Sequence, residues 1–354
     1  VYPLLVAEFA LRRRDYDVAL ENYLTQAQIL RDAGVSAHTT HLTQFMRRER
    51  EAMEAAQLWV ELEPDNAEAQ NTLANLLLRQ GRSLEALPHL AAVQRLGSPA
   101  RFPTLLNGFE QLDAQQQTEL VEGINALARE WPDNTQLLMT QALLHAEFEQ
   151  FPQALKKLDA LFKIEPYQPQ AILLEARVLM ATGDKKPFAR LEQAVADKPK
   201  DQELRLQYAR LLTASDMPAA RKQFEILSAQ SPRDGDLLLS LALINRETGD
   251  DVAAKAYLKQ MLALQQRVDE AHFYLGRIAE DQNDPQQAIS HYLQVEGQAE
   301  FLSANLRIGQ ILIGNGEQAQ AQALFLEQRK AYPDRAEQIF SLEADLLTQA
   351  DEVP

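Results

Sequence analysis

The sequence contains no cysteine, and this absence removes two classes of site. Neither a disulfide framework nor a thiolate metal centre can form without that residue. A chain without cysteine is compatible with an oxidising compartment such as the periplasm. The 354 residues also lack any apolar run of the roughly 20 residues that a membrane-spanning helix needs, so no membrane span is expected.

Basic residues are in deficit, with 35 lysines and arginines against 51 acidic residues and a net charge of −16. Nucleic acid is therefore not an expected partner. The six histidines form no HExxH motif, and no nucleophile elbow, phosphate-binding loop or dinucleotide-binding loop occurs. We therefore predict no catalytic residue, no metal site and no cofactor, and we expect that the chain is not an enzyme.

A repeat is what the sequence does contain. One residue, usually alanine, recurs every 33 or 34 positions, with a single gap of two periods. These positions are Ala52, Ala86, Leu120, Ala154, Ala220, Ala254, Ala288 and Ala321. Prolines follow the same period at Pro64, Pro132, Pro166, Pro199, Pro232 and Pro333, where each is expected to end a helix. Glycines at Gly81, Gly183, Gly249 and Gly316 are expected in the turns between paired helices.

The clearest copy of the repeat runs from residue 267 to residue 297. It reads RVDEAHFYLGRIAEDQNDPQQAISHYLQVEG, with small and apolar residues spaced for one face of a helix before and after a short turn. The Leu275-Gly276, Ala288 and Tyr292 pattern resembles the tetratricopeptide repeat (TPR) family. This resemblance implies an all-α fold, a superhelical solenoid of helix hairpins in which each hairpin stacks on its neighbours.

The period predicts a single array over residues 1–354. Ten hairpins are expected at about 1–33, 35–65, 66–98, 99–133, 134–166, 167–199, 200–232, 233–266, 267–298 and 299–334. Residues 335–354 are expected to form a terminal helix or a truncated repeat. The fourth hairpin carries Pro99, Pro103 and Gly108 and has Leu120 in its small-residue position, so we expect a looser repeat and a hinge there, or ordinary drift within a solenoid.

First helices of stacked TPR hairpins line the concave side of such arrays. Stepping by the period from the residue after Gly276 defines a set of positions that we call the first-helix lane. Its members are His41, Asn75, Phe109, Leu143, Arg177, Arg210, Leu243, Arg277 and Gln310. Arginine can hold a carboxylate through two parallel hydrogen bonds, and an amide can both donate to and accept from a peptide backbone.

The predicted partner-binding residues of this surface are Asn71, Asn75, Arg177, Arg210, Phe273 and Arg277. The alternative is that these arginines pair with acidic residues of adjacent repeats. TPR domains that clamp a C-terminal carboxylate use a set of lysine, asparagine and arginine. Here Asn75 matches an asparagine of that set, but Asn71 stands where lysine belongs, so a strict specificity for C-terminal carboxylates is not expected.

The first 50 residues differ from the rest in charge, because they hold seven basic and six acidic residues, a balance of +1. The arginines that stand out are Arg12, Arg13, Arg14, Arg47, Arg48 and Arg50. Since Arg13 and Arg47 are one period apart, the two groups should lie side by side as a basic edge. This edge either docks a partner or simply places cations at helix C-termini, where the helix dipole favours them.

A narrower resemblance rests on the N-terminal third. The stretches YPLLVAEFALRRRDYDVALENYLTQA, DAGVSAHTTHLTQF and LWVELEPDNAEAQNTLANLLLRQGR are similar to the start of TPR outer-membrane lipoproteins of pseudomonads and their relatives. Such proteins are non-catalytic. The resemblance implies an adaptor that binds and activates a periplasmic carboxyl-terminal processing protease and helps present protein substrates such as peptidoglycan hydrolases. It also implies a lipid anchor in the outer membrane, on a cysteine that precedes Val1.

Two other functions remain open. The same fold could serve as a structural assembly scaffold of a cell-envelope or secretion complex unrelated to proteolysis. It could also be the substrate-binding arm of an enzyme domain that lies outside this sequence.

Overall fold

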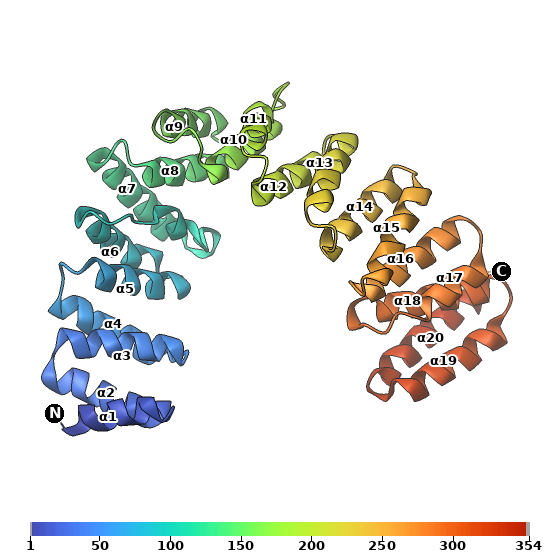
Figure 1. The fold of residues 1–354 in the computed structure, drawn as a ribbon, viewed down its shortest axis with the longest axis horizontal. Coiled ribbons are helices and arrows are strands. Elements are labelled where there is room, and N and C mark those ends of the chain that lie inside the picture. Colours follow the sequence, from blue (N-terminus) through green and yellow to red (C-terminus); the bar gives the residue numbers. More distant parts are fainter. Residues whose placement is uncertain (1, 352–354) are drawn as a thin grey trace. The chain divides into compact units, whose positions relative to one another are not determined.

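The computed structural model describes residues 2–351, and within that range every regular element is a helix. The predicted all-α fold is confirmed. Contacts divide the chain into two compact units, the first ending at Ala194 and the second beginning at Val195. The prediction of a single continuous array stays a prediction. Figure 1 shows the helices following one another as hairpins in each unit.

The first unit contains five hairpins and the start of a sixth. Its helices are α1 (Tyr2–Arg12), α2 (Tyr16–Leu30), α3 (Ala33–Phe45), α4 (Glu49–Leu62), α5 (Ala67–Arg79), α6 (Ser83–Arg95), η1 (Phe102–Leu106), η2 (Phe109–Gln111), α7 (Ala114–Glu130), α8 (Thr135–Glu147), α9 (Phe151–Ile164) and α10 (Pro169–Ala181). Helix α11 (Ala189–Asp197) contains the boundary between the units.

The second unit continues with the same alternation of first and second helices. It holds α12 (Gln202–Leu212), α13 (Met217–Gln230), α14 (Gly235–Glu247), α15 (Asp251–Ala263), α16 (Val268–Asp281), α17 (Pro285–Tyr292), α18 (Gln298–Gly314), α19 (Gln318–Ala331), η3 (Pro333–Arg335) and α20 (Ala336–Asp351). Helix α20 packs against both α18 and α19, which places it as the last layer of this unit.

The turn inside most hairpins contains one residue with positive φ. The predicted turn glycines occupy this position, for example Gly81 with φ of 72°. Arg14, Arg47, Glu149 and Asn283 adopt the same conformation in other hairpins. The amide after the positive-φ residue bonds back to the first helix, as in the 3.0 Å bond from Arg82 N to Leu77 O. This closing bond satisfies carbonyls at the end of the first helix and sets the sharp reversal of the chain.

The turns between hairpins combine a proline with a capping side chain. Pro64 ends α4, and two residues later the Asn66 side chain accepts hydrogen bonds from the amides of Glu68 and Ala69, at 2.9 and 3.2 Å. Asn134, Asp201 and Asp234 cap the next first helices in the same position after a proline. Each proline stops one helix, and the Asn or Asp that follows starts the next.

The repeated small residue is where paired helices meet. Ala86, Ala154, Ala220, Ala254 and Ala288 are all fully buried. In the α16–α17 hairpin the approach is tight, since a Cβ on Gly276 would lie 2.6 Å from Cε1 of Tyr292. A larger residue would force the helices apart, which explains why small residues recur at the period.

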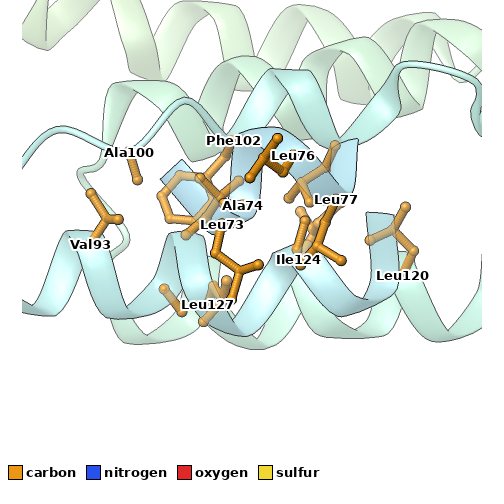
Figure 2. Close-up of a cluster of buried hydrophobic side chains, with 14 of the residues drawn as sticks. Leu73, Ala74, Leu76, Leu77, Val93, Ala100, Phe102, Leu120, Ile124 and Leu127 are labelled. Atoms are coloured by element: carbon orange, nitrogen blue, oxygen red, sulfur yellow. The ribbon is translucent and has the colours of Figure 1, made fainter. Parts of the chain in front are cut away.

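The fourth hairpin differs in its first half. The predicted first α-helix is replaced by two short 3₁₀ segments, η1 and η2, joined at Gly108, whose φ is 76°. Pro99 and Pro103 interrupt the helical hydrogen bonds, and the glycine reverses the chain between the two segments. Phe102 and Leu120 fill the space, and Figure 2 shows both within one buried cluster that reaches from α4 to α8. The fourth hairpin is therefore irregular, with 3₁₀ turns in place of its first helix, while the predicted looseness and hinge stay predictions.

Candidate polypeptide-binding surface

The first-helix lane lies on first helices or, in the fourth hairpin, on η2. Asn75 on α5, Arg177 on α10 and Arg210 on α12 are exposed. His41 on α3 and Gln310 on α18 are exposed as well. Arg177 lies in the first unit, whereas Arg210 and Arg277 lie in the second, so the predicted set of arginines is divided between the units.

Amides and a cation in the first unit are available to a ligand. Asn71 is half-buried and Asn75 exposed, one helical turn apart on α5, and neither side chain forms a hydrogen bond within residues 2–351. Arg177 has no ion pair in the same range. These groups keep their hydrogen-bonding capacity for another molecule, as a peptide-binding surface requires. Their role in binding stays a prediction.

Arg210 and Arg277 of the second unit differ. Arg210 is exposed and forms no ion pair with any described residue. Arg277 is half-buried, and its Nε lies 3.7 Å from Oε2 of Glu280 on the same helix. The alternative of internal pairing thus applies to Arg277, although its partner is in its own helix rather than in the adjacent repeat. Phe273 lies mainly against Tyr274 and Tyr292, with ring centroids 5.5 and 5.8 Å apart.

Glu280 is the centre of a polar cluster that the sequence did not reveal. Its carboxylate accepts a hydrogen bond from the Tyr292 hydroxyl at 2.7 Å and lies 2.9 Å from Nη2 of Arg307 on the next first helix. Burial, followed by the hydrogen bond to Glu280, raises the pKa of Tyr292. The hydrogen bond to Glu280 also raises the pKa of Arg307. The cluster joins two hairpins through half-buried charged groups, so its main role is structural.

The basic edge is formed by two neighbouring turns. Nη2 of Arg48, at the start of α4, lies 3.2 Å from Oδ1 of Asp17, at the start of α2. Arg50 pairs with Glu54 in its own helix at 3.1 Å. The remaining arginines of the edge are exposed and form no ion pair with a described residue; they are Arg12, Arg13, Arg14 and Arg47. Free cations therefore remain here, and their use in docking stays a prediction.

Other charged residues join successive hairpins along their edges. Arg95 pairs with Glu130 at 3.0 Å, and Arg246 pairs with Asp281 at 2.9 Å. Because these groups are largely exposed, each pair contributes at most about 1 kcal/mol. They mainly fix the register between neighbouring hairpins.

One hollow lies on the lane itself, in the fourth and fifth hairpins. Phe109 and Leu143, two lane members, line it together with residues of η1, η2 and α8, and its volume is about 250 Å³. The period placed both residues on the lane but gave no sign of a hollow. Pro103 and Gly108 could have indicated the hollow. They break the first segment into 3₁₀ turns, which cannot fill the space that a regular helix occupies.

Residues 2–351 contain no group of three or more potential ligands suited to a metal ion. Within the same range, no helix is both long enough and apolar enough to cross a bilayer.

Comparison with known proteins supports the repeat family. The tetratricopeptide repeat family model matches residues 209–266 and 251–303. A TPR repeat-containing protein of Pseudomonas aeruginosa is 33% identical over 99% of this chain. The chain spans 60% of the length of that relative.

Solved TPR structures align with the chain at low identity. A tetratricopeptide repeat protein from Parabacteroides merdae is 15% identical, with a TM-score of 0.44 and coverage of 79% of this chain and 98% of that one. Yeast Tom70 is 12% identical, with a TM-score of 0.35 and coverage of 98% and 96%.

Proposed function

We propose that this all-α array of tetratricopeptide repeats is a non-catalytic scaffold that binds polypeptide partners along its first-helix lane. TPR repeats are protein-interaction modules, since stacked hairpins present long surfaces of regularly spaced side chains. The observation that carries the proposal is a set of exposed lane groups, Asn75, Arg177 and Arg210, whose side chains have no ion-pair or hydrogen-bond partner among the described residues. A polypeptide supplies both the carbonyls and the carboxylates that such amides and guanidinium groups bind.

The more specific proposal concerns the partner. The N-terminal third is similar to LbcA, an outer-membrane lipoprotein that binds a periplasmic carboxyl-terminal processing protease. By that similarity the chain would bind and activate such a protease, and would help present substrates such as peptidoglycan hydrolases. It would act in the periplasm, held to the outer membrane by a lipid on a segment before Val1. The similarity of the whole chain to a TPR repeat-containing protein of P. aeruginosa supports this proposal.

A binding and cleavage experiment tests this proposal. Purified chain would be mixed with the processing protease in a pull-down, and cleavage of a peptidoglycan hydrolase would be followed with and without the chain. We expect retention of the protease and faster cleavage. A chain that neither retains the protease nor changes the cleavage rate would contradict the specific proposal.

Charge-reversal variants locate the surface. Arg177→Glu combined with Arg210→Glu should weaken partner binding, because both side chains are exposed lane cations without an ion pair. Arg129→Glu combined with Lys222→Glu is the matched control, since it changes the charge equally at exposed positions of second helices α7 and α13. Equal loss of binding in both double variants would show a non-specific effect of net charge and not a lane.

A further inference from the structure

The hollow on the lane arises from the irregular fourth hairpin. Segments η1 and η2 form one wall and α8 forms the other. The η2 wall is tied to α7, because the side-chain amide of Gln117 on α7 donates to the carbonyls of Phe109 and Leu112, at 3.1 and 3.2 Å. A hollow bounded by tied backbone is present before any ligand arrives, which lowers the entropic cost of binding.

The floor of this hollow is apolar. Phe109 is only 5% exposed, and Leu106 and Leu143 are half-buried. The Phe109 ring meets the exposed Phe148 edge to face, at a centroid distance of 5.9 Å. A methylene chain placed on this floor would therefore lose water contact over most of its length.

The charged residues on the rim of the hollow are both acidic. Glu110 and Glu147 line the hollow, are exposed, and form no ion pair or side-chain hydrogen bond with any residue in the range 2–351. The Asn107 amide lies on the same rim. Carboxylates beside an apolar floor attract a cation more strongly than carboxylates in open water, since the floor lowers the local dielectric. The hollow thus combines a surface for an aliphatic chain with acceptors for a positive group.

We propose that this hollow receives a single arginine or lysine side chain of a bound polypeptide. The proposal rests on the function proposed above, because it assigns a side-chain preference to the same lane. At about 250 Å³ the hollow is smaller than the roughly 300–1,000 Å³ of small-molecule pockets and suits one long side chain. The methylenes of that side chain pack on Leu106, Phe109 and Leu143, and its cationic head meets Glu110 and Glu147.

Defined peptides test the preference. Short fluorescent peptides of Ser, Thr and Ala would carry one variable central residue, either arginine, the uncharged isostere citrulline, or norleucine. Binding would be followed by fluorescence anisotropy, and methyl NMR signals of Leu106 and Leu143 would report the place of contact. We expect the arginine peptide to bind about two- to fivefold more tightly than the citrulline peptide, the range expected for one partly exposed ion pair. It should also shift both methyl signals.

Two variants complete the experiment. Glu110→Gln with Glu147→Gln should remove the arginine preference. The matched control, Glu122→Gln with Glu149→Gln, alters exposed carboxylates that do not line the hollow and should keep that preference. Equal binding of arginine and citrulline peptides by the unaltered chain, or unchanged methyl signals, would overturn the proposal. If the hollow variant loses the preference while the intact chain retains no protease, the protease proposal fails, whereas polypeptide binding on the lane and the side-chain assignment stand.

Discussion

The hairpin of α16 and α17 and the fourth hairpin, built from η1, η2 and α7, share a period but not a packing mode. In the first, Gly276 leaves no room for a Cβ beside the buried ring of Tyr292, and Ala288 is fully buried. In the fourth, Leu120 occupies the position of Ala288 and is also fully buried. The period therefore fixes where hairpins occur, whereas the size of one residue decides how closely the two halves approach.

The difference in packing has a counterpart in polar chemistry. In the hairpin of α16 and α17, which we call the close-packed hairpin, the Glu280 carboxylate binds both Tyr292 and Arg307. The fourth hairpin, which we call the open hairpin, borders a hollow. Two carboxylates line it, Glu110 and Glu147, and neither has an ion-pair or side-chain hydrogen-bond partner within residues 2–351. The two places thus differ in what their carboxylates do: Glu280 holds neighbouring hairpins together, whereas Glu110 on η2 and Glu147 on α8 face a hollow.

The largest effect is expected from Leu120→Ala, which gives the fourth hairpin the residue of a regular one. Leu120 on α7 is fully buried in the apolar cluster that residues of α4 to α8 form, so truncation should leave a cavity and lower the free energy of unfolding by about 2–5 kcal/mol. Chemical denaturation would measure the loss. Leu96→Ala is the control, because Leu96 is 37% exposed and its truncation should cost about 1 kcal/mol or less. A loss for Leu120→Ala no larger than that of the control would mean the open hairpin does not depend on this residue.

The contact between Gly276 and the Tyr292 ring sets the next largest effect, in the close-packed hairpin. Gly276→Ala should lower the free energy of unfolding by about 1–3 kcal/mol, because the new methyl group meets the Tyr292 ring. The gain of about 1 kcal/mol in helix propensity only partly offsets this clash. Gly314→Ala on α18 is the control, since nothing lies within 4 Å of the added Cβ, and stability should stay level or rise. A stabilised Gly276→Ala protein would refute the close approach.

A smaller effect should separate two lane arginines. Arg277→Glu places a second carboxylate near Glu280 and should cost about 1 kcal/mol of stability. Arg210→Glu alters an exposed, unpaired side chain, and its cost should stay within about 0.5 kcal/mol. Thermal unfolding of the two variants under identical conditions gives the comparison. Equal losses would show that Arg277 is as free as Arg210.

The smallest effect is the contribution of one histidine pair in the close-packed hairpin to the pH dependence of stability. Nδ1 of His272 on α16 lies 3.1 Å from Nδ1 of His291 on α17, which requires one ring nitrogen to donate and the other to accept. Burial lowers the pKa of both histidines, and the second is lowered further by His272, Lys255 and Lys259, while Asp269 partly opposes the shift of the first.

Because the folded pair binds fewer protons than the unfolded chain, stability should fall as pH drops below the unfolded pKa of about 6.5. His291→Gln should flatten this dependence between about pH 7 and 5. Urea denaturation across that pH range measures the slope. The same slope in the variant and the unaltered chain would exclude the pair as its source.

Much of the fold followed from local chemistry. The sequence predicted the positions of the buried alanines, the turn glycines and the prolines after second helices. Each of these residues acts on the chain within a few residues of itself. The sequence did not predict the 3₁₀ form of η1 and η2. The prolines and the glycine indicate that the first helix is interrupted, but not which conformation replaces it. The hollow at Phe109 depends on contacts between elements, which a spacing rule does not encode. The pair of Arg277 and Glu280 lies within α16 at a spacing of three residues, so local helix geometry could have indicated it.

The most direct test of polypeptide binding on the first-helix lane is site-specific photocrosslinking. A photoreactive residue would replace Asn75 on α5 in one protein and Lys156 on the second helix α9 in another, both at exposed positions. Each protein would be irradiated with the processing protease and its hydrolase substrate. We predict covalent polypeptide adducts from position 75 and none from position 156. Adducts from position 156 alone, or from neither position, would contradict binding along the lane.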